Sequence, residues 1–278
     1  MNKNKKTIVE FKNITFGYNP EVMVLNDINF SILENEYICI IGHNGSGKST
    51  ISKVLTGLLK PMSGELYIKD NLIDHTNINF IRSNIGIVFQ NPDNQFIGIT
   101  AEDDIAFGLE NRRIPQEKMK DIIIQAAKSV EVDKLLSLES QKLSGGEKQR
   151  VAIASILAIN PSIIIFDEST SMLDPKGKKE LKELMLFLRD KKDKTVISIT
   201  HDMEEVINAD KVIVLNKGKI ASQGKPEVIF TDEDELKKMA LDFPFILKIA
   251  CGLNKSNSKI KRTLNRSELV KNICQMIK

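Results

Sequence analysis

The sequence predicts an α/β fold built on a mostly parallel sheet, with a helical block inserted in the middle of the chain. Short apolar, β-branched segments alternate with amphipathic helical segments, as they do where crossover helices join parallel strands. From about residue 91 to residue 160 the pattern changes to helices and polar loops, and strand-like segments then return. We therefore expect a core of residues 1–90 and 161–225, an inserted helical subdomain of residues 91–160 and a C-terminal helical extension of residues 226–278.

The composition excludes several classes of protein. The 278 residues carry 40 Lys and Arg against 37 Asp and Glu, so the net charge of +3 offers no electrostatic footprint for a nucleic-acid partner. The three cysteines are far apart in the chain and predict no disulfide framework. No apolar segment approaches the ~18 residues that a membrane-spanning helix requires. We expect a cytosolic chain whose work on any membrane goes through a partner.

The first elements lead to a glycine-rich turn. Residues 7–11 and 28–32 are short β-branched segments, and residues 37–41 are apolar on both faces, as in a buried central strand. After a turn, apolar residues recur at helical spacing and predict a helix that ends before Pro61. The periodic residues are Ile51, Val54, Leu55 and Leu58.

The turn itself fits the phosphate-binding motif G-x-x-x-x-G-K-[ST]. Its residues are Gly42, His43, Asn44, Gly45, Ser46, Gly47, Lys48 and Ser49, and Thr50 follows. The glycines let backbone N–H groups face the phosphates of a nucleotide, and the N-terminus of the following helix adds a favourable dipole. We expect Lys48 to bind β- and γ-phosphate oxygens and the Ser49 hydroxyl to bind Mg²⁺. A chance glycine-rich turn is the alternative, and the flanking strand and helix argue against it.

Two acids follow the next buried strand. Residues 163–166 are apolar and lead directly to Asp167 and Glu168, which places both carboxylates at the C-terminal end of a strand. Ligands bind at that edge in open α/β sheets. Asp167 suits the acid that holds Mg²⁺, and Glu168 suits the group that polarises the attacking water. Together with the glycine-rich turn, these acids predict a nucleotide triphosphatase.

The remaining elements are assigned by their periodicity. Residues 116–130 and 144–159 have a helical pattern, as does the charged segment around Leu181. Residues 195–199 are strand-like, and residues 212–220 have the pattern of a hairpin. In the C-terminal extension we expect a helix with one apolar face, made of Leu236, Met239, Ala240 and Phe243.

A second candidate phosphate site opens the helix at residue 144. Ser144 and Glu147 form an S-x-x-E capping box, whose simplest interpretation is a well-capped helix. Gly145 and Gly146, however, lower the helix propensity and require another reason. Exposed N–H groups at a helix start can bind an anion. We therefore expect Ser144, Gly145 and Gly146 to contact the ATP of a second molecule.

With these residues the chain resembles the ATP-binding cassette (ABC) ATPases, whose signature sequence is L-S-G-G-Q. The resemblance covers about residues 7–225. It implies ATP and Mg²⁺ as cofactors. It also implies that Tyr18 stacks on the adenine and that Gln90 senses Mg²⁺ and the attacking water. Residues 171–174, with Asp174, would link two sites across a dimer, and His201 would contact the γ-phosphate. Glu147 in place of the signature glutamine, and Ser169 in place of a frequent proline, depart from the family pattern; neither removes a phosphate donor or a catalytic acid.

Residues 89–96, 102–111 and 167–175 further resemble the ATPases of energy-coupling-factor (ECF) transporters, and within them the first of two ATPase paralogues. That resemblance implies a heterodimer with the second paralogue, a membrane T subunit and a substrate-binding S subunit. It also implies a peripheral position on the cytoplasmic face of the cell membrane and uptake of a vitamin or transition metal. The C-terminal extension corresponds to a dimerising region in these ATPases; simple packing is the other interpretation.

Two alternatives remain. The first is a soluble ABC ATPase that acts on ribosomes or in DNA repair. Against it, the chain has a single cassette and no sustained heptads of an inserted coiled coil. The second is a P-loop kinase, which would leave Ser144, Asp174 and His201 unexplained.

Overall fold

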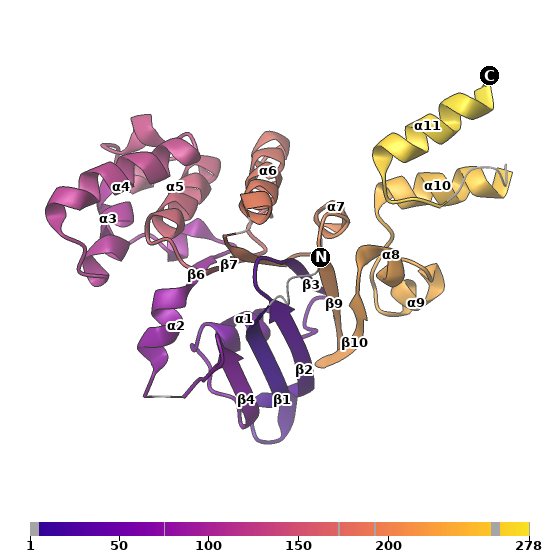
Figure 1. Ribbon diagram of the computed structural model, residues 1–278, viewed down its shortest axis with the longest axis horizontal. Coiled ribbons are helices and arrows are strands. Elements are labelled where there is room, and N and C mark those ends of the chain that lie inside the picture. The colour runs from indigo at the N-terminus through magenta and orange to yellow at the C-terminus, as the bar shows by residue number, and fades with distance from the viewer. Residues whose placement is uncertain (1–5, 75, 172, 192, 257–261, 278) are drawn as a thin grey trace.

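The protein consists of two sheets, a helical block and a C-terminal helical arm (Figure 1). The structure is a computed structural model and describes residues 6–74, 76–171, 173–191, 193–256 and 262–277. Over this part of the chain, no helix combines the length and the apolar character that crossing a membrane requires.

A six-stranded sheet in the order β10-β9-β3-β8-β7-β6 forms the centre. Its strands are β3 (Tyr37–Gly42), β6 (Ile85–Val88), β7 (Ile163–Asp167), β8 (Thr195–Ile199), β9 (Lys211–Asn216) and β10 (Lys219–Gly224). Neighbours from β9 to β6 pair in parallel, and β10 pairs antiparallel with β9 as the expected hairpin. β3 and β8 are buried along their whole length because both faces of the sheet are covered.

A separate antiparallel sheet in the order β2-β1-β4-β5 lies beside the central one. Its strands are β1 (Thr7–Asn19), β2 (Val22–Leu33), β4 (Ser63–Ile68) and β5 (Asn71–Leu72). The sequence predicted only short strands at the N-terminus, whereas β1 and β2 have 13 and 12 residues. Register shifts interrupt their pairing, so the apolar alternation that would mark long strands is broken. Helix α1 (Lys48–Leu55) shares one apolar core with both sheets.

The opposite face of the central sheet belongs to a second core. Ile163 and Ile165 of β7 belong to the core around α1, whereas Ile164 and Phe166 belong to the second core, as strand alternation requires. This core extends into the helical block and along α6. The helices are α2 (Ile78–Asn84), α3 (Ala101–Asn111), α4 (Gln116–Ser129), α5 (Gly145–Ala158), α6 (Pro175–Lys191), α7 (Met203–Val206), α8 (Pro226–Ile229), α9 (Glu233–Lys238), α10 (Phe245–Ser256) and α11 (Arg266–Ile277).

The C-terminal extension is helical, but its first part differs from the prediction. Helix α9 ends at Lys238, and Ala240 is exposed with a φ of 54°, so the expected four-residue apolar face does not form. Pro244 follows Phe243 directly and disfavours helical backbone there. Leu236 and Phe243 are buried nevertheless, because the turn carries the chain back to the core.

Replacement of Phe166 tests how far the stability of the protein depends on the second core. Its side chain is fully buried, so Phe166→Ala should lower the free energy of unfolding by about 3–5 kcal/mol. Chemical denaturation measures this change. Phe187→Ala is the control, because 52% of Phe187 is exposed and its loss should cost less than about 1 kcal/mol. Equal losses for the two variants would contradict this assignment of the core.

Candidate functional site

The glycine-rich turn connects β3 to α1 and holds Lys48 inside the protein. Gly45 and Gly47 have φ values of 81° and 108°, a region that favours glycine. A Cβ atom on Gly47 would also lie 2.8 Å from Cδ2 of Leu25. The Lys48 ammonium donates to the carbonyl oxygens of Gly42 at 2.9 Å and His43 at 3.2 Å. The turn therefore places a buried cation at its own mouth, where a phosphate would bind.

Glu168 lies at the centre of the site. Its backbone has a φ of 48°, and its N–H donates to the carbonyl oxygen of Ile199 on β8 at 2.8 Å. Its Oε1 is 3.8 Å from Nζ of Lys48. Its Oε2 accepts a hydrogen bond from Nε2 of Gln90 at 3.3 Å and lies 3.9 Å from Nδ1 of His201. The fold thus brings three residues that are distant in the sequence, Lys48, Gln90 and His201, around one carboxylate.

Asp167 is held by a residue that the sequence analysis missed. The hydroxyl of Ser52 on α1 donates to Oδ2 of Asp167 at 2.6 Å. Burial raises the pKa of Asp167, and the Ser52 hydrogen bond opposes that rise. The sequence did carry a signal, since Ser52 lies one helical turn after Ser49 and can share its face. The motif, however, ends before Ser52, so only the tertiary structure pairs it with Asp167.

The charges of the site oppose one another. Burial lowers the pKa of Lys48, whereas the nearby carboxylates of Glu168 and Asp167 favour its charged form. A cation and two acids therefore share a partly desolvated space. In such a space the attraction between these groups and opposite charges is stronger than it would be in water.

A cavity of about 470 Å³ opens beside the turn. The described residues that line it come from β1, β2, the turn, the start of α1 and Glu168. Tyr18 forms its outer wall and is 63% exposed. Its ring packs edge-on against the ring of Phe16, with 5.1 Å between the ring centroids. An exposed aromatic face next to a phosphate cradle is suited to stacking on a flat base.

The second candidate phosphate site stands elsewhere, at the start of α5 in the helical block. The hydroxyl and N–H of Ser144 donate to Oε2 of Glu147 at 2.7 and 2.8 Å, and the N–H of Glu147 donates back to the hydroxyl. These bonds lower the pKa of Glu147. A Cβ atom on Gly145 would meet nothing within 4 Å, and one on Gly146 would meet only Leu173. Packing within the described chain therefore does not require either glycine.

Asp174 lies in the loop that follows the two acids. Its Oδ1 accepts a hydrogen bond from the N–H of Gly177 at 2.9 Å and so fixes the first turn of α6. Both the N–H and the hydroxyl of Ser171 donate to the carbonyl oxygen of Glu168. Met172, which lies between Ser171 and Asp174 in the sequence, is outside the described residues. The loop is thus tied directly to Glu168.

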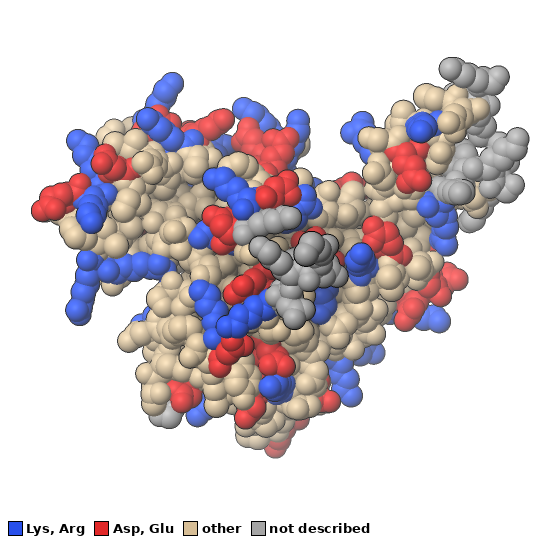
Figure 2. All heavy atoms as spheres, in the orientation of Figure 1, with Lys and Arg blue, Asp and Glu red and all other residues tan. Residues whose placement is uncertain are grey.

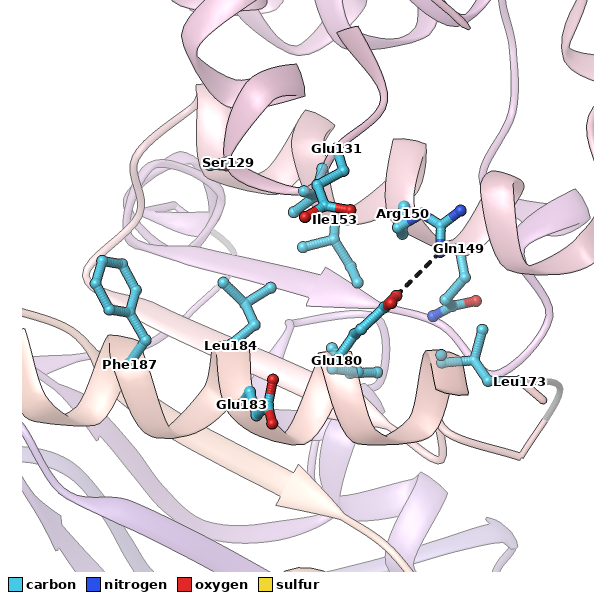
Figure 3. A pocket seen from close by; sticks show the side chains of 13 residues that line it. Ser129, Glu131, Gln149, Arg150, Ile153, Leu173, Glu180, Glu183, Leu184 and Phe187 are labelled. Atoms are coloured by element: carbon cyan, nitrogen blue, oxygen red, sulfur yellow. Dashed lines mark hydrogen bonds and ion pairs between the residues drawn. The ribbon is translucent and has the colours of Figure 1, made fainter. Parts of the chain in front are cut away.

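A groove between α5 and α6 is separate from this chemistry. Figure 3 shows apolar side chains on both of its walls, with Ile153 on one side and Leu184 and Phe187 on the other, among polar and charged residues. The ion pair between Arg150 and Glu180, at 3.2 Å, bridges it. The groove marks the junction of the helical block with α6.

The chain is similar to several known proteins. A family model described as ABC transporter matches residues 25–171. The energy-coupling factor transporter ATP-binding protein EcfA1 of Ureaplasma parvum serovar 3 is 62% identical over 267 residues, which cover 96% of this chain and 91% of that protein. The protein of the same name from Mycoplasmoides gallisepticum is 57% identical over 274 residues, covering 99% of this chain and 98% of its own.

Solved structures show the same similarity. The structure of cbiO1 from Clostridium perfringens, described as part of the ABC transporter complex cbiONQ, has a TM-score of 0.75 and 33% identity, covering 84% of this chain and 94% of its own. The ATP-binding cassette MJ0796, solved as a dimer in a post-hydrolysis state with ADP and Pi, has a TM-score of 0.72 and 31% identity. That match covers 79% of this chain and 99% of MJ0796.

Ser52 provides a test of how Asp167 is held. The sequence predicts Asp167 as a Mg²⁺ ligand, and Ser52→Ala removes a hydrogen bond to this charged acceptor, worth about 1.5–3 kcal/mol. On that prediction, the Mg²⁺ concentration for half-maximal ATP hydrolysis should rise on the order of tenfold. Activity measured against Mg²⁺ concentration checks this. Ser155→Ala is the control, because its hydroxyl only donates to the carbonyl oxygen of Val151 within α5. An unchanged Mg²⁺ requirement in Ser52→Ala would remove the role given to this bond.

Proposed function

Because the chain belongs to the ABC transporter family, within the ATP-binding proteins of energy-coupling-factor transporters, we propose that it is the motor subunit that hydrolyses ATP to drive uptake of a vitamin or transition metal. Family membership rests on the matched model and on relatives of more than half identity over nearly the whole chain. The relatives' name also agrees with the predicted first ATPase paralogue. The observation that carries the mechanism is the convergence of Lys48, Gln90 and His201 on Glu168.

ATP binds across the cavity beside the glycine-rich turn. Tyr18 stacks on the adenine, and the N–H groups of residues 43–50 surround the phosphates. Lys48 exchanges its bonds to the carbonyl oxygens of Gly42 and His43 for phosphate oxygens. Because those carbonyl bonds are weaker than bonds to a charged acceptor, the exchange favours the bound nucleotide.

The donors around Asp167 fit Mg²⁺. This ion prefers oxygen ligands and keeps several waters, and the site offers the hydroxyl of Ser49, the carboxylate of Asp167 and the side-chain oxygen of Gln90. When bound, Mg²⁺ neutralises charge on the phosphates. Asp167 is already oriented by Ser52, so one ligand is preorganised.

Glu168 polarises the attacking water. Its carboxylate accepts the hydrogen bond of the water and withdraws the proton as the oxygen attacks the γ-phosphorus. The bond from the γ-phosphorus to the β–γ bridging oxygen breaks, and ADP leaves with that oxygen. Gln90 donates to the same carboxylate and fixes its orientation. His201, next to the same oxygen, contacts the γ-phosphate. Lys48 stabilises the charge that spreads over the phosphate oxygens.

The second phosphate site completes a paired arrangement. Ser144, Gly145 and Gly146 cover the γ-phosphate of ATP bound in the second ATPase paralogue, and Asp174 links the two sites across the heterodimer. The open space beside Gly145 and the dimer of MJ0796 with ADP and Pi support this arrangement. The two ATPase subunits close on two ATP molecules and reopen after hydrolysis. The population shifts between the closed and open conformations because ATP binds the two with different affinity.

Residues 91–160 pass the motion to the membrane T subunit, and the S subunit selects the substrate. Residues 1–90 and 161–225 form the catalytic core, and residues 226–278 extend it. The subunit acts at the cytoplasmic face of the membrane through these partners. On the face in Figure 2, Lys and Arg are interspersed with Asp and Glu among the described residues, which favours protein partners over nucleic acid.

The partners are tested by purification from membranes. A tagged chain should bring down one paralogous ATPase and membrane proteins in a fixed ratio, identified by mass spectrometry. The untagged host provides the background. Recovery of ribosomes or DNA in place of membrane proteins would support the soluble alternative and remove the transport proposal.

The catalytic role is tested in the assembled complex with Glu168→Gln. The amide cannot withdraw a proton, so ATP turnover should fall by at least about 10²-fold, while nucleotide binding should persist. Steady-state hydrolysis and equilibrium binding of labelled ATP measure the two effects. Glu183→Gln on α6 is the control, since its carboxylate pairs only loosely with Lys179, at 3.8 Å. Unimpaired turnover in Glu168→Gln would show that another group activates the water.

A further inference from the structure

A buried carboxylate outside the reacting groups connects the two segments that carry them. Glu205 lies on the short helix α7 and is only 2% exposed. Its Oε1 accepts a hydrogen bond from the hydroxyl of Thr170 at 2.9 Å, and its Oε2 accepts one from the hydroxyl of Ser198 at 2.8 Å. Thr170 and Ser198 are 5% and 1% exposed, so neither donor has ready access to water. Each carboxylate oxygen thus has a buried donor of its own.

The two donors stand beside the catalytic residues. Thr170 follows Glu168 by two positions, in the loop that leads to Asp174, and Ser198 precedes His201 by three positions on β8. Ser198 pairs with Cys39 on β3 and with Phe166 on β7, so it occupies the rigid middle of the central sheet. Glu205 therefore fastens a loop to a fixed strand.

This fastening adds to the sheet pairing and does not duplicate it. The strand ladder holds the chain as far as Asp167, opposite Ile199, and the N–H of Glu168 adds one bond to Ile199. Beyond Glu168, the loop no longer belongs to the sheet. Thr170 is the next residue bonded to another segment, so Glu205 fixes the path of the loop after Glu168 together with the local bonds of Ser171.

The carboxylate is suited to this role by its environment. Burial raises the pKa of Glu205, and the hydrogen bonds from Ser198 and Thr170 oppose that rise. An acceptor with two oxygens can satisfy both hydroxyls at once. Removal of the carboxylate would leave two buried donors without an acceptor, which the structure would relieve by moving the loop.

We propose that Glu205 is a positioning residue that holds Glu168, His201 and the Asp174 loop in the arrangement that hydrolysis requires. This role rests on the proposed ATPase function. Glu205 does not contact the nucleotide; it acts on the rate of the chemical step through Thr170 and Ser198. Displacing a catalytic group by about 1 Å can reduce a rate on the order of 10²-fold, so a loosened loop has a large effect without any loss of ATP binding.

The test compares kcat and KM for ATP in the assembled transporter complex. Glu205→Ala and Thr170→Val should lower kcat on the order of tenfold and leave KM within about twofold, because the cavity walls that bind ATP belong to other elements. Glu205→Gln should retain more activity than Glu205→Ala, since its amide can accept from one hydroxyl and donate to the other. Glu204→Gln is the matched control, because Glu204 lies one position earlier on α7 and is exposed. Its carboxylate accepts a hydrogen bond from the N–H of Phe245, at Oε1.

The number of nucleotide-binding sites per complex is measured as well. It distinguishes a loss of positioning in folded complexes from a loss of folded protein. If Glu205→Ala does not assemble, Thr170→Val decides the question, because valine keeps the shape of threonine but lacks the hydroxyl that donates to Glu205. An unchanged kcat in Thr170→Val, or a loss of kcat that only matches a loss of binding sites, would overturn the role of Glu205. An unmodified complex that fails to hydrolyse ATP would overturn the proposed function itself, and this role with it.

Discussion

Burial of the central strands on both faces is the constraint from which the site follows. β3, β7 and β8 are buried almost along their whole length, so their interiors carry almost only apolar side chains. Polar groups with a chemical task are therefore confined to the ends of these strands. Because the strands run parallel, those ends meet at one edge, and the glycine-rich turn, the two acids and His201 come together there.

The same edge gathers charges that only partly compensate one another. Lys48 is 4% exposed, and its nearest carboxylate oxygen, on Glu168, is 3.8 Å away. The ammonium instead uses the carbonyl oxygens of the turn, and Asp167 uses the hydroxyl of Ser52. These neutral partners hold the charged groups in place. In the proposed mechanism Lys48 exchanges its carbonyl oxygens for phosphate oxygens, while Ser52 keeps Asp167 oriented. The hydrogen bonds that the hydroxyls of Thr170 and Ser198 donate give Glu205 the same kind of support by neutral partners.

The segment that matches the family signature, residues 144–147, has a different explanation. The capping box of Ser144 and Glu147 makes α5 begin at a defined residue, and this much is local. The two glycines after Ser144 weaken the helix without any gain in packing within the described chain. The proposed function gives them a reason outside the chain, in the ATP of a second subunit, and it makes one cassette half of a reaction centre. The replacement of the signature glutamine by Glu147 keeps the capping bonds intact.

The sequence by itself determined the α/β class, the phosphate-binding turn, the two acids at a strand end and the family, because these depend on short-range pattern and spacing. It also placed Gln90 and His201 among the site residues, through resemblance. Only the tertiary structure decided what each group touches. The long β1–β2 pair was hidden by its register shifts, and the end of α9 at Lys238 by the turn before Pro244. Ser52 and Glu205 carry no motif, since their partners Asp167, Thr170 and Ser198 are reached through the fold and not along the chain. Long-range hydrogen bonds leave no local periodicity, and for that physical reason they could not be predicted.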